Sequence, residues 1–177
     1  MLNQNLAAAT PALKNRLAAL PSDAAVGLWT FNGLEASTLI PTGPLSDDLG
    51  GGPRSAALTG ALDGVVAVSG SGGVSFTTLR MIYADALANY RPGQPNSILV
   101  ITQGPHTDKS LDGAGLQDVI RSSIDPNRPV AVNVIDVGDD PDRPTWEAVA
   151  QISGGYYQNV PAADSPDAAA AIARLLS

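Results

Sequence analysis

The residues best suited to chemistry follow a short apolar run in the second half of the chain. Ile98–Ile101 is bounded by prolines and a glycine, which is typical of a strand buried on both faces and ending in a polar loop. Open α/β sheets bind ligands at the carboxyl ends of such strands. The loop carries His106, the only histidine of 177 residues, followed by Thr107 and Asp108. A general base suits this position, but no nucleophile is assigned beside it, so a solvated loop histidine is favoured.

Two other polar segments have residue types that could bind an ion. The glycine-rich Ser69–Gly73 could cradle a phosphate, but it lacks the lysine that ends a P-loop, and a plain connector is favoured. Asp139, Asp140 and Asp142 could attract Ca²⁺, although their spacing does not match an EF-hand. Because Pro144 follows, Asp142 is predicted to cap a helix.

Composition excludes several classes of function. The net charge is −7 and the basic residues do not cluster, so nucleic acid and anionic membrane surfaces are poor partners. The lack of cysteine excludes disulfides, zinc–thiolate sites and cysteine nucleophiles. No apolar stretch approaches the ~20 residues that cross a bilayer, so we expect no direct membrane insertion. We also expect any export signal to lie outside this chain.

The hydrophobic pattern alternates strands with helices. It predicts a doubly wound, mostly parallel α/β sheet with helices on both faces, and a single domain over residues 1–177. Leu2–Leu20 has helical spacing, with a kink or break near Pro11. Strands are predicted at 25–31, 35–40 (an antiparallel edge), 97–102, 129–137 and 156–160, helices at 55–66, 77–90, 113–123, 144–154 and 166–176, and an exposed loop at 41–53.

Several segments resemble the von Willebrand factor type A (VWA) domain. Thr102-Gln103-Gly104, followed by Thr107-Asp108, is similar to the Thr-Asp-Gly and Thr-Asp that end the family's fourth strand, with Gln103 replacing the metal-proximal aspartate. Further matches are Leu17–Phe31, Val134–Gly155 and Thr77-x-Leu79. The resemblance covers essentially the whole chain and implies a VWA/Rossmann-like fold.

The family's first strand, which ends Asp-x-Ser-x-Ser, has no counterpart in this sequence. In the family it is central, between the strands that correspond to Ala25–Phe31 and Ser97–Thr102. We therefore expect the sequence to be the C-terminal part of a longer protein, with the central position vacant. The flanking strands would then pair directly, giving five strands, or expose edges that promote self-association.

The resemblance implies a metal-ion-dependent adhesion site, where a partner's carboxylate completes the coordination of Mg²⁺ or Mn²⁺. Of the metal ligands, only Thr77 could keep its family role here, and Gln103 offers a neutral oxygen in place of a carboxylate. We therefore expect a degenerate site with no cofactor in this chain, and Mg²⁺ only if an upstream Asp-x-Ser-x-Ser is present. The alternative role for Thr77 is a helix N-cap.

The function that the resemblance implies is a protein-interaction or adhesion module, not an enzyme, within a larger cell-envelope or secreted protein. Its ligand would be a protein bound at the carboxyl edge of the sheet. The candidate ligand-binding residues are Asn32, Ser71, Ser75, Thr77, Gln103, His106, Asp108 and Asp139. One alternative is a hydrolase or nucleotide-binding enzyme that uses Ser69–Gly73 and His106, and another is a purely structural domain. Trp29 and Trp146 are predicted to be core or half-buried anchors.

Overall fold

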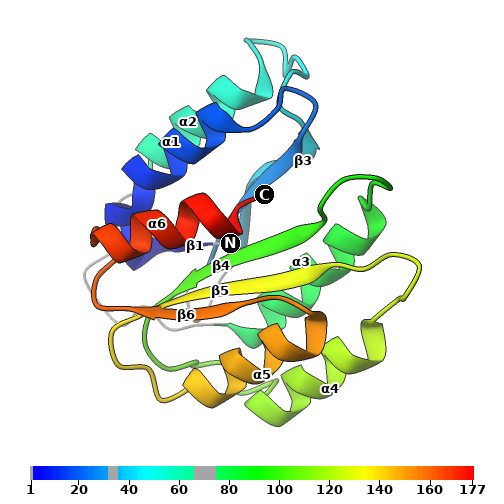
Figure 1. Ribbon diagram of the computed structural model, residues 1–177, viewed down its shortest axis with the longest axis vertical. Helices are drawn as coiled ribbons and strands as arrows, with labels where there is room; N and C mark the ends of the chain where they lie inside the picture. Colours follow the sequence, from blue (N-terminus) through cyan, green and yellow to red (C-terminus); the bar gives the residue numbers. More distant parts are fainter. Residues whose placement is uncertain (1, 32–35, 66–74) are drawn as a thin grey trace.

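Six strands form one sheet in the computed structural model, which describes residues 2–31, 36–65 and 75–177 (Figure 1). The strand order is β3-β2-β1-β4-β5-β6, and only the β2–β3 pair is antiparallel. The α/β fold with a mostly parallel sheet is therefore confirmed. The strands are β1 Leu2–Asn3, β2 Ala25–Phe31, β3 Ala36–Pro44, β4 Ser97–Thr102, β5 Ala131–Val137 and β6 Tyr157–Val160.

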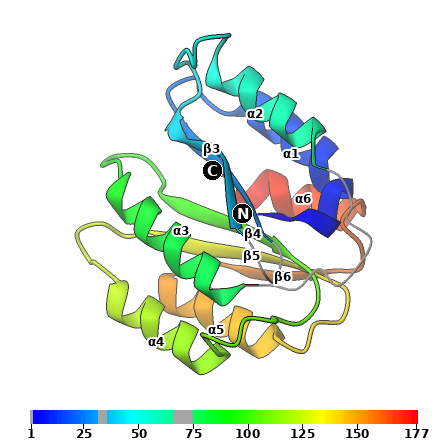
Figure 2. The same ribbon diagram turned by 180° about the vertical axis from the view of Figure 1, so that it is seen from behind.

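Helices cover both faces of the sheet. Helices α1 (Thr10–Ala19), α2 (Arg54–Asp63) and α6 (Pro166–Leu175) lie on one face, and α3 (Phe76–Ala88), α4 (Gly113–Ser123) and α5 (Arg143–Ser153) lie on the other (Figures 1 and 2). Their ends follow local signals. Ser75 and Ser165 accept backbone N–H bonds as N-caps, and Gly154 ends α5 with φ of 77°. From α1 onward, the predicted helices and strands agree with these bounds to within a few residues, whereas β1 lies in a stretch that was predicted to be helical.

The start of the chain contains the predicted break. A 3-10 helix, Gln4–Ala9, precedes α1, and Pro11 lies in the first turn of α1, where its missing N–H is not needed. The strand after Phe31 also differs from expectation. It extends to Pro44, so the predicted loop at 41–53 begins later; the buried Arg54 side chain donates to the carbonyls of Pro41 and Pro44 and holds this end.

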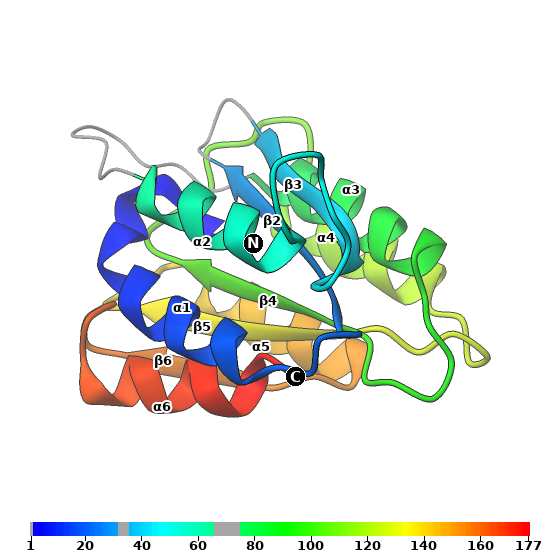
Figure 3. The ribbon, with the colours of Figure 1, turned by 90° about the horizontal axis from the view of Figure 1, so that it is seen from above.

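The strand β1 lies between β2 and β4, where direct pairing of those two strands was expected. Leu2 lies opposite Thr30 of β2 and Ile101 of β4, so β1 separates two strands that were expected to pair directly (Figure 3). The two described residues of β1 lie beside the carboxyl ends of β2 and β4. The prediction of five strands with direct β2–β4 pairing is therefore wrong.

Two hydrophobic cores lie on the two faces. One joins α1, α2 and α6 to the sheet around Leu17, Leu58 and Ile172, and the other joins α3, α4 and α5 around Phe76, Leu116 and Trp146. Trp146 is fully buried and Trp29 is partly buried against the second core, as predicted. Among the described helices, none has the length and apolar character to span a membrane.

Candidate functional site

The candidate site lies where β4, β5 and β6 end and α3 and α5 begin. Parallel pairing brings the carboxyl ends of β4, β5 and β6 to one edge, so the polar loops after β4 and β5 meet there (Figure 1). Contacts between residues 31 to 36 positions apart in the sequence hold these loops to each other and to α3.

His106 is the centre of the first of these contacts. Its ring stacks on Phe76 with a centroid distance of 4.2 Å, and its Nδ1 lies 2.9 Å from both carboxylate oxygens of Asp142. The His106 backbone N–H also donates to Asp142. Asp142 stands at the N-cap position of α5 but makes no side-chain cap bond, so its predicted capping role is wrong. It binds the β4–α4 loop instead.

Asp108 makes the second contact, at the start of α3. Its carboxylate accepts the backbone N–H of Thr77 at 3.0 Å and of Ser110 at 2.8 Å, and the Ser75 hydroxyl lies 3.4 Å away. Burial alone would raise the pKa of Asp108, but these hydrogen bonds, with one from the Thr77 side chain, outweigh it and lower the pKa to about 2. The N-cap of α3 is Ser75 and not Thr77, because Ser75 Oγ accepts the Thr78 N–H.

The other predicted site residues are exposed, buried or outside the described residues. Gln103 and Asp139 are exposed, so their side chains are available to a partner, whereas Ser75 is buried. Asn32 and Ser71 lie outside the described residues, as does the whole of 69–73. The structure therefore brings Ser75, Thr77, His106 and Asp108 together and presents Gln103 and Asp139 from neighbouring loops.

The side-chain oxygen atoms of the described residues near Thr77 do not fit a Mg²⁺ site. Such an ion requires several oxygen ligands in octahedral geometry. Asp108 is the carboxylate that contacts Thr77, and its oxygens already accept N–H and hydroxyl groups. No group of three or more histidine and carboxylate side chains within the described ranges could hold a metal.

Sequence reasoning missed a buried acidic cluster beside this edge. Asp136, at the end of β5, is fully buried and accepts the Tyr157 hydroxyl at 2.7 Å, and Asp140 is 7% exposed. Burial raises the pKa of both carboxyls, that of Asp140 to about 7, and their mutual contact and repulsion add to the shift of Asp140. The missed signal was a carboxylate that directly follows Val134 and Ile135, near the end of a strand that was predicted to be central.

The geometry at His106 has part of what a general base needs. Asp142 orients the imidazole, which is the second half of a nucleophile–base–carboxylate arrangement. The other ring nitrogen, however, makes no hydrogen bond to any residue that the structure describes, so no nucleophile is assembled there. The arrangement fixes a loop, and it presents polar side chains at the sheet edge.

Comparisons with known proteins found curated relatives and solved structures that are similar to this chain. No family model matches the chain. Two curated relatives, the "uncharacterized protein" MT1884 and the "uncharacterized protein" Rv1836c, from two Mycobacterium tuberculosis strains, are each 60% identical to it over 175 residues. The match covers 99% of this chain and 26% of each relative, so the chain spans about a quarter of their length.

Solved structures show the fold. A von Willebrand factor type A protein from Catenulispora acidiphila superposes with a TM-score of 0.70 at 19% identity, over 98% of this chain and 38% of that one. BatB from Bacteroides thetaiotaomicron gives 0.61 at 16% identity, over 97% and 86% of the two chains. The SpRpn10 VWA domain gives 0.56 at 17% identity, over 95% and 78%. The sheet order, the helices on both faces and these superpositions together establish that the chain has a VWA-like fold.

Proposed function

We propose that the chain is a protein-interaction module that binds a protein ligand at the carboxyl edge of its sheet without a metal ion. The observation that carries the proposal is the preorganised pair of loops after β4 and β5. Asp142 binds His106, and Asp108 holds the middle of the β4–α4 loop against the start of α3. A loop held in this way loses little conformational entropy when a partner binds.

The exposed side chains of these loops would make the contacts. Gln103 offers both an amide donor and an acceptor, and Asp139 offers a carboxylate, so together they suit a polar protein surface with basic groups. His106 is half-buried, and it would contribute mainly by holding the loop. We further propose that the module works outside the cytoplasm, as the C-terminal part of a larger envelope or secreted protein. The VWA-like fold and the much longer mycobacterial relatives support that proposal.

Site-specific photocrosslinking tests the interaction surface. A benzoylphenylalanine is placed at Gln103 and, as a matched control, at Asn127, an exposed amide in the loop before β5 at the opposite edge. Both proteins are irradiated in an envelope extract of the source organism, with and without EDTA. We expect a discrete adduct from position 103 only, unchanged by EDTA.

Affinity for the cross-linked partner then gives the decisive measurement. Gln103→Arg should weaken binding about 10-fold, equivalent to ~1.4 kcal/mol, whereas Asn127→Arg should leave it unchanged. Equal adducts from both positions, or an adduct that requires Mg²⁺, would contradict the proposal.

A further inference from the structure

The two buried carboxyls beside the carboxyl edge, Asp136 and Asp140, are in hydrogen-bond contact with each other. Asp136 accepts the Tyr157 hydroxyl at 2.7 Å, and Asp140 accepts the Asp142 backbone N–H at 2.8 Å. The other oxygen of each carboxyl is buried and has no hydrogen-bond partner among the described residues. Two charged carboxylates in contact repel each other, whereas one proton held between them satisfies both of the remaining oxygens.

A third unpaired oxygen lies on the same face of the sheet. Thr102 is fully buried and lies opposite Asp136 in the β4–β5 ladder, so both side chains point to the core beneath α3, α4 and α5. Within the described ranges the Thr102 hydroxyl has no hydrogen-bond partner either. Even when this hydroxyl donates its hydrogen to Asp136, one oxygen of the pair is without a donor unless a proton is bound.

The surroundings of the pair favour a bound proton at neutral pH. Burial is the largest effect and raises the pKa of both carboxyls, that of Asp140 to about 7. The Tyr157 hydroxyl and the Arg143 charge lower the pKa of Asp136 but do not outweigh burial. The charged and titratable groups around the pair lie in the adjoining loop, in α5, in β6 and in the β4–α4 loop: Asp142, Arg143, Glu147, Tyr157 and His106.

Asp140 is the member of the pair that can move. Asp136 belongs to β5, and the Asn159 side chain donates to the carbonyls of Asp136 and Gly138, so β6 holds the strand as far as Gly138. Asp140 lies in the loop between β5 and α5 (Figure 1), with an exposed residue on each side. A second negative charge on the pair would therefore turn the Asp140 side chain outward to water.

That movement would reach the candidate site through Asp142. The Asp142 backbone N–H would lose its acceptor, Asp140. The Asp142 carboxylate accepts the His106 backbone N–H and lies 2.9 Å from its Nδ1. The contact that joins the two loops at the carboxyl edge therefore begins one hydrogen bond away from the buried pair.

We propose that Asp136 and Asp140 form a proton-binding site that controls the order of the two loops at the carboxyl edge. With the proton bound, Asp140 accepts the Asp142 N–H and the loops are held together. When the proton is lost, Asp140 turns outward and the contact between His106 and Asp142 loosens. The consequence for binding rests on the proposed function: a protein partner at this edge would bind more tightly at acidic than at alkaline pH.

Amide exchange of the full chain, followed by NMR with EDTA present, tests the control of the loops. Each rate is divided by the intrinsic rate at the same pH. We expect the protection of the Asp142 and His106 amides to fall about 10-fold from pH 6 to pH 8, because the closed loop loses this factor per pH unit below the Asp140 pKa of about 7 and nothing further above it. The Gly115 amide, bound to the exposed Asp112, should not change. The Val134 amide, inside the sheet, should stay far more protected at both pH values, which separates local opening from unfolding.

Two variants identify the groups responsible. Asp140→Asn should abolish the fall, because its amide can donate to Asp136 while its oxygen accepts the Asp142 N–H, as in the protonated residue. Asp139→Asn, which removes the exposed neighbouring carboxylate, should retain the fall. If Asp140→Asn impairs folding, Asp136→Asn also leaves a single carboxyl and should abolish the fall. No fall in the wild-type chain, or an equal fall in the variant with one carboxyl, would overturn the proposal.

Cross-linking from position 103 separates this proposal from the proposed function. In the envelope extract, the wild-type chain should give more adduct at pH 6 than at pH 8, and Asp140→Asn should give equal amounts, because only the closed loops bind. Equal wild-type adducts at both pH values would overturn the regulation of binding. A complete lack of adduct, with the amide effect intact, would contradict the interaction surface and support the proton site alone.

Discussion

At the scale of single residues, the most unusual groups are the buried carboxyls Asp136 and Asp140. A charged carboxylate is costly to bury. Within the described part of the chain, the hydrogen-bond donors to this pair from other residues are the Tyr157 hydroxyl and the Asp142 backbone N–H. One oxygen of each carboxyl is buried without a hydrogen-bond partner among the described residues. The pair therefore retains a proton that an unfolded chain would release, which links the stability of the fold to pH.

Replacing Asp140 with asparagine should flatten the pH dependence of stability. The pKa of Asp140 is about 7 in the folded chain against 3.8 ordinarily, so the folded state binds more protons between these values. Stability should therefore be greatest below pH 3.8 as far as this group is concerned, fall as pH rises toward 7, and stay constant above. Asp140→Asn should remove that fall and gain about 1–3 kcal/mol at pH 8. Urea unfolding from pH 4 to pH 8 measures this.

The control for that experiment is Asp139→Asn, which neutralises the exposed neighbouring carboxylate. This variant should retain the wild-type dependence of the unfolding free energy on pH. If both variants changed the pH dependence of the unfolding free energy equally, net charge rather than the buried pair would determine it.

Asp108 should change the stability with pH in the direction opposite to Asp140. Its pKa is about 2, below the ordinary 3.8, so its contribution is present above pH 3.8 and lost as pH falls through 2. Asp108→Asn removes the charge that accepts the N–H groups of Thr77 and Ser110, and should cost about 1 kcal/mol at pH 7. Chemical unfolding at pH 7 measures this loss, with Asp139→Asn as the control that removes an exposed carboxylate. No loss at pH 7 would show that Ser75 alone caps α3.

At the scale of elements, the junction between α5 and β6 depends on two glycines. Gly154 adopts a left-handed conformation with φ of 77°, which ends the helix without steric cost. Gly155 then passes directly over β5: a Cβ placed there would lie 2.1 Å from the Val132 carbonyl oxygen. This close approach of two backbones allows β6 to pair beside β5.

Gly155→Ala should therefore be strongly destabilising. Val132 lies inside a paired strand and cannot move away, so we expect a loss of about 2–4 kcal/mol, within the range of severe steric changes. Gly60→Ala is the matched control, because nothing lies within 4 Å of its added Cβ and it stands within α2. That substitution should stabilise the chain by about 0.5–1 kcal/mol. Thermal unfolding of the two variants compares them directly, and similar midpoints would refute the packing argument.

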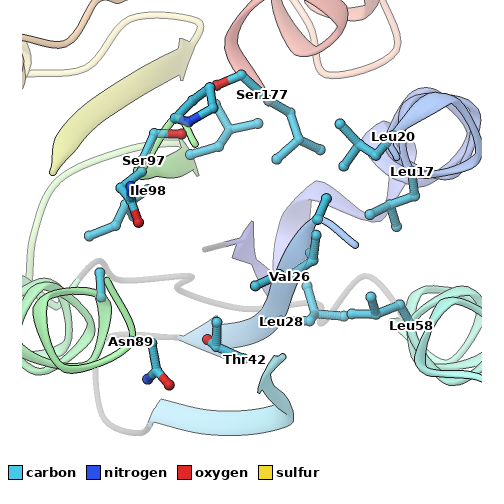
Figure 4. A pocket seen from close by; sticks show the side chains of 18 of the residues that line it. Leu17, Leu20, Val26, Leu28, Thr42, Leu58, Asn89, Ser97, Ile98 and Ser177 are labelled. Atoms are coloured by element: carbon cyan, nitrogen blue, oxygen red, sulfur yellow. The ribbon is translucent and has the colours of Figure 1, made fainter. Parts of the chain in front are cut away.

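At the scale of the whole molecule, the polar site and an apolar groove lie at opposite ends of the sheet. The carboxyl edge carries the loops that we propose for protein binding. The groove has a volume of about 490 Å³, and Leu17, Val26, Leu28 and Leu58 are among the residues that line it (Figure 4). A partner at the carboxyl edge would therefore not contact the residues that line the groove.

Metal titration tests how the carboxyl edge works. Calorimetric titration with Mg²⁺ or Mn²⁺ should show no saturable binding at micromolar metal, because Thr77 and Gln103 supply no carboxylate between them. Gln103→Asp adds one carboxylate and should not by itself create tight binding, since one carboxylate and one hydroxyl cannot hold Mg²⁺ against water. Gln103→Asn is the matched control. Micromolar binding in the wild-type chain would contradict the metal-independent proposal.

The sequence by itself determined the local structure of this protein. Apolar runs with period two or no period marked β2, β4 and β5, helical spacing marked α3 to α6, and Pro11, Ser165 and Gly154 marked ends that the structure confirms. These signals lie within a few residues of the feature that they specify, so no knowledge of distant contacts is needed to read them. The resemblance to VWA domains likewise rested on short ordered motifs, and the solved structures confirm the fold.

Only the tertiary structure decided how the loops meet. The sequence placed His106, Asp108 and Asp139 at one edge, but the partnership of His106 with Asp142, 36 positions away, depends on which loops the parallel sheet brings together. The same holds for Asp136 with Tyr157, and for the two residues of β1 that enter the centre of the sheet in place of a direct β2–β4 pair. Such contacts are set by long-range pairing and by the burial of charge, and neither has a periodic signature in the sequence.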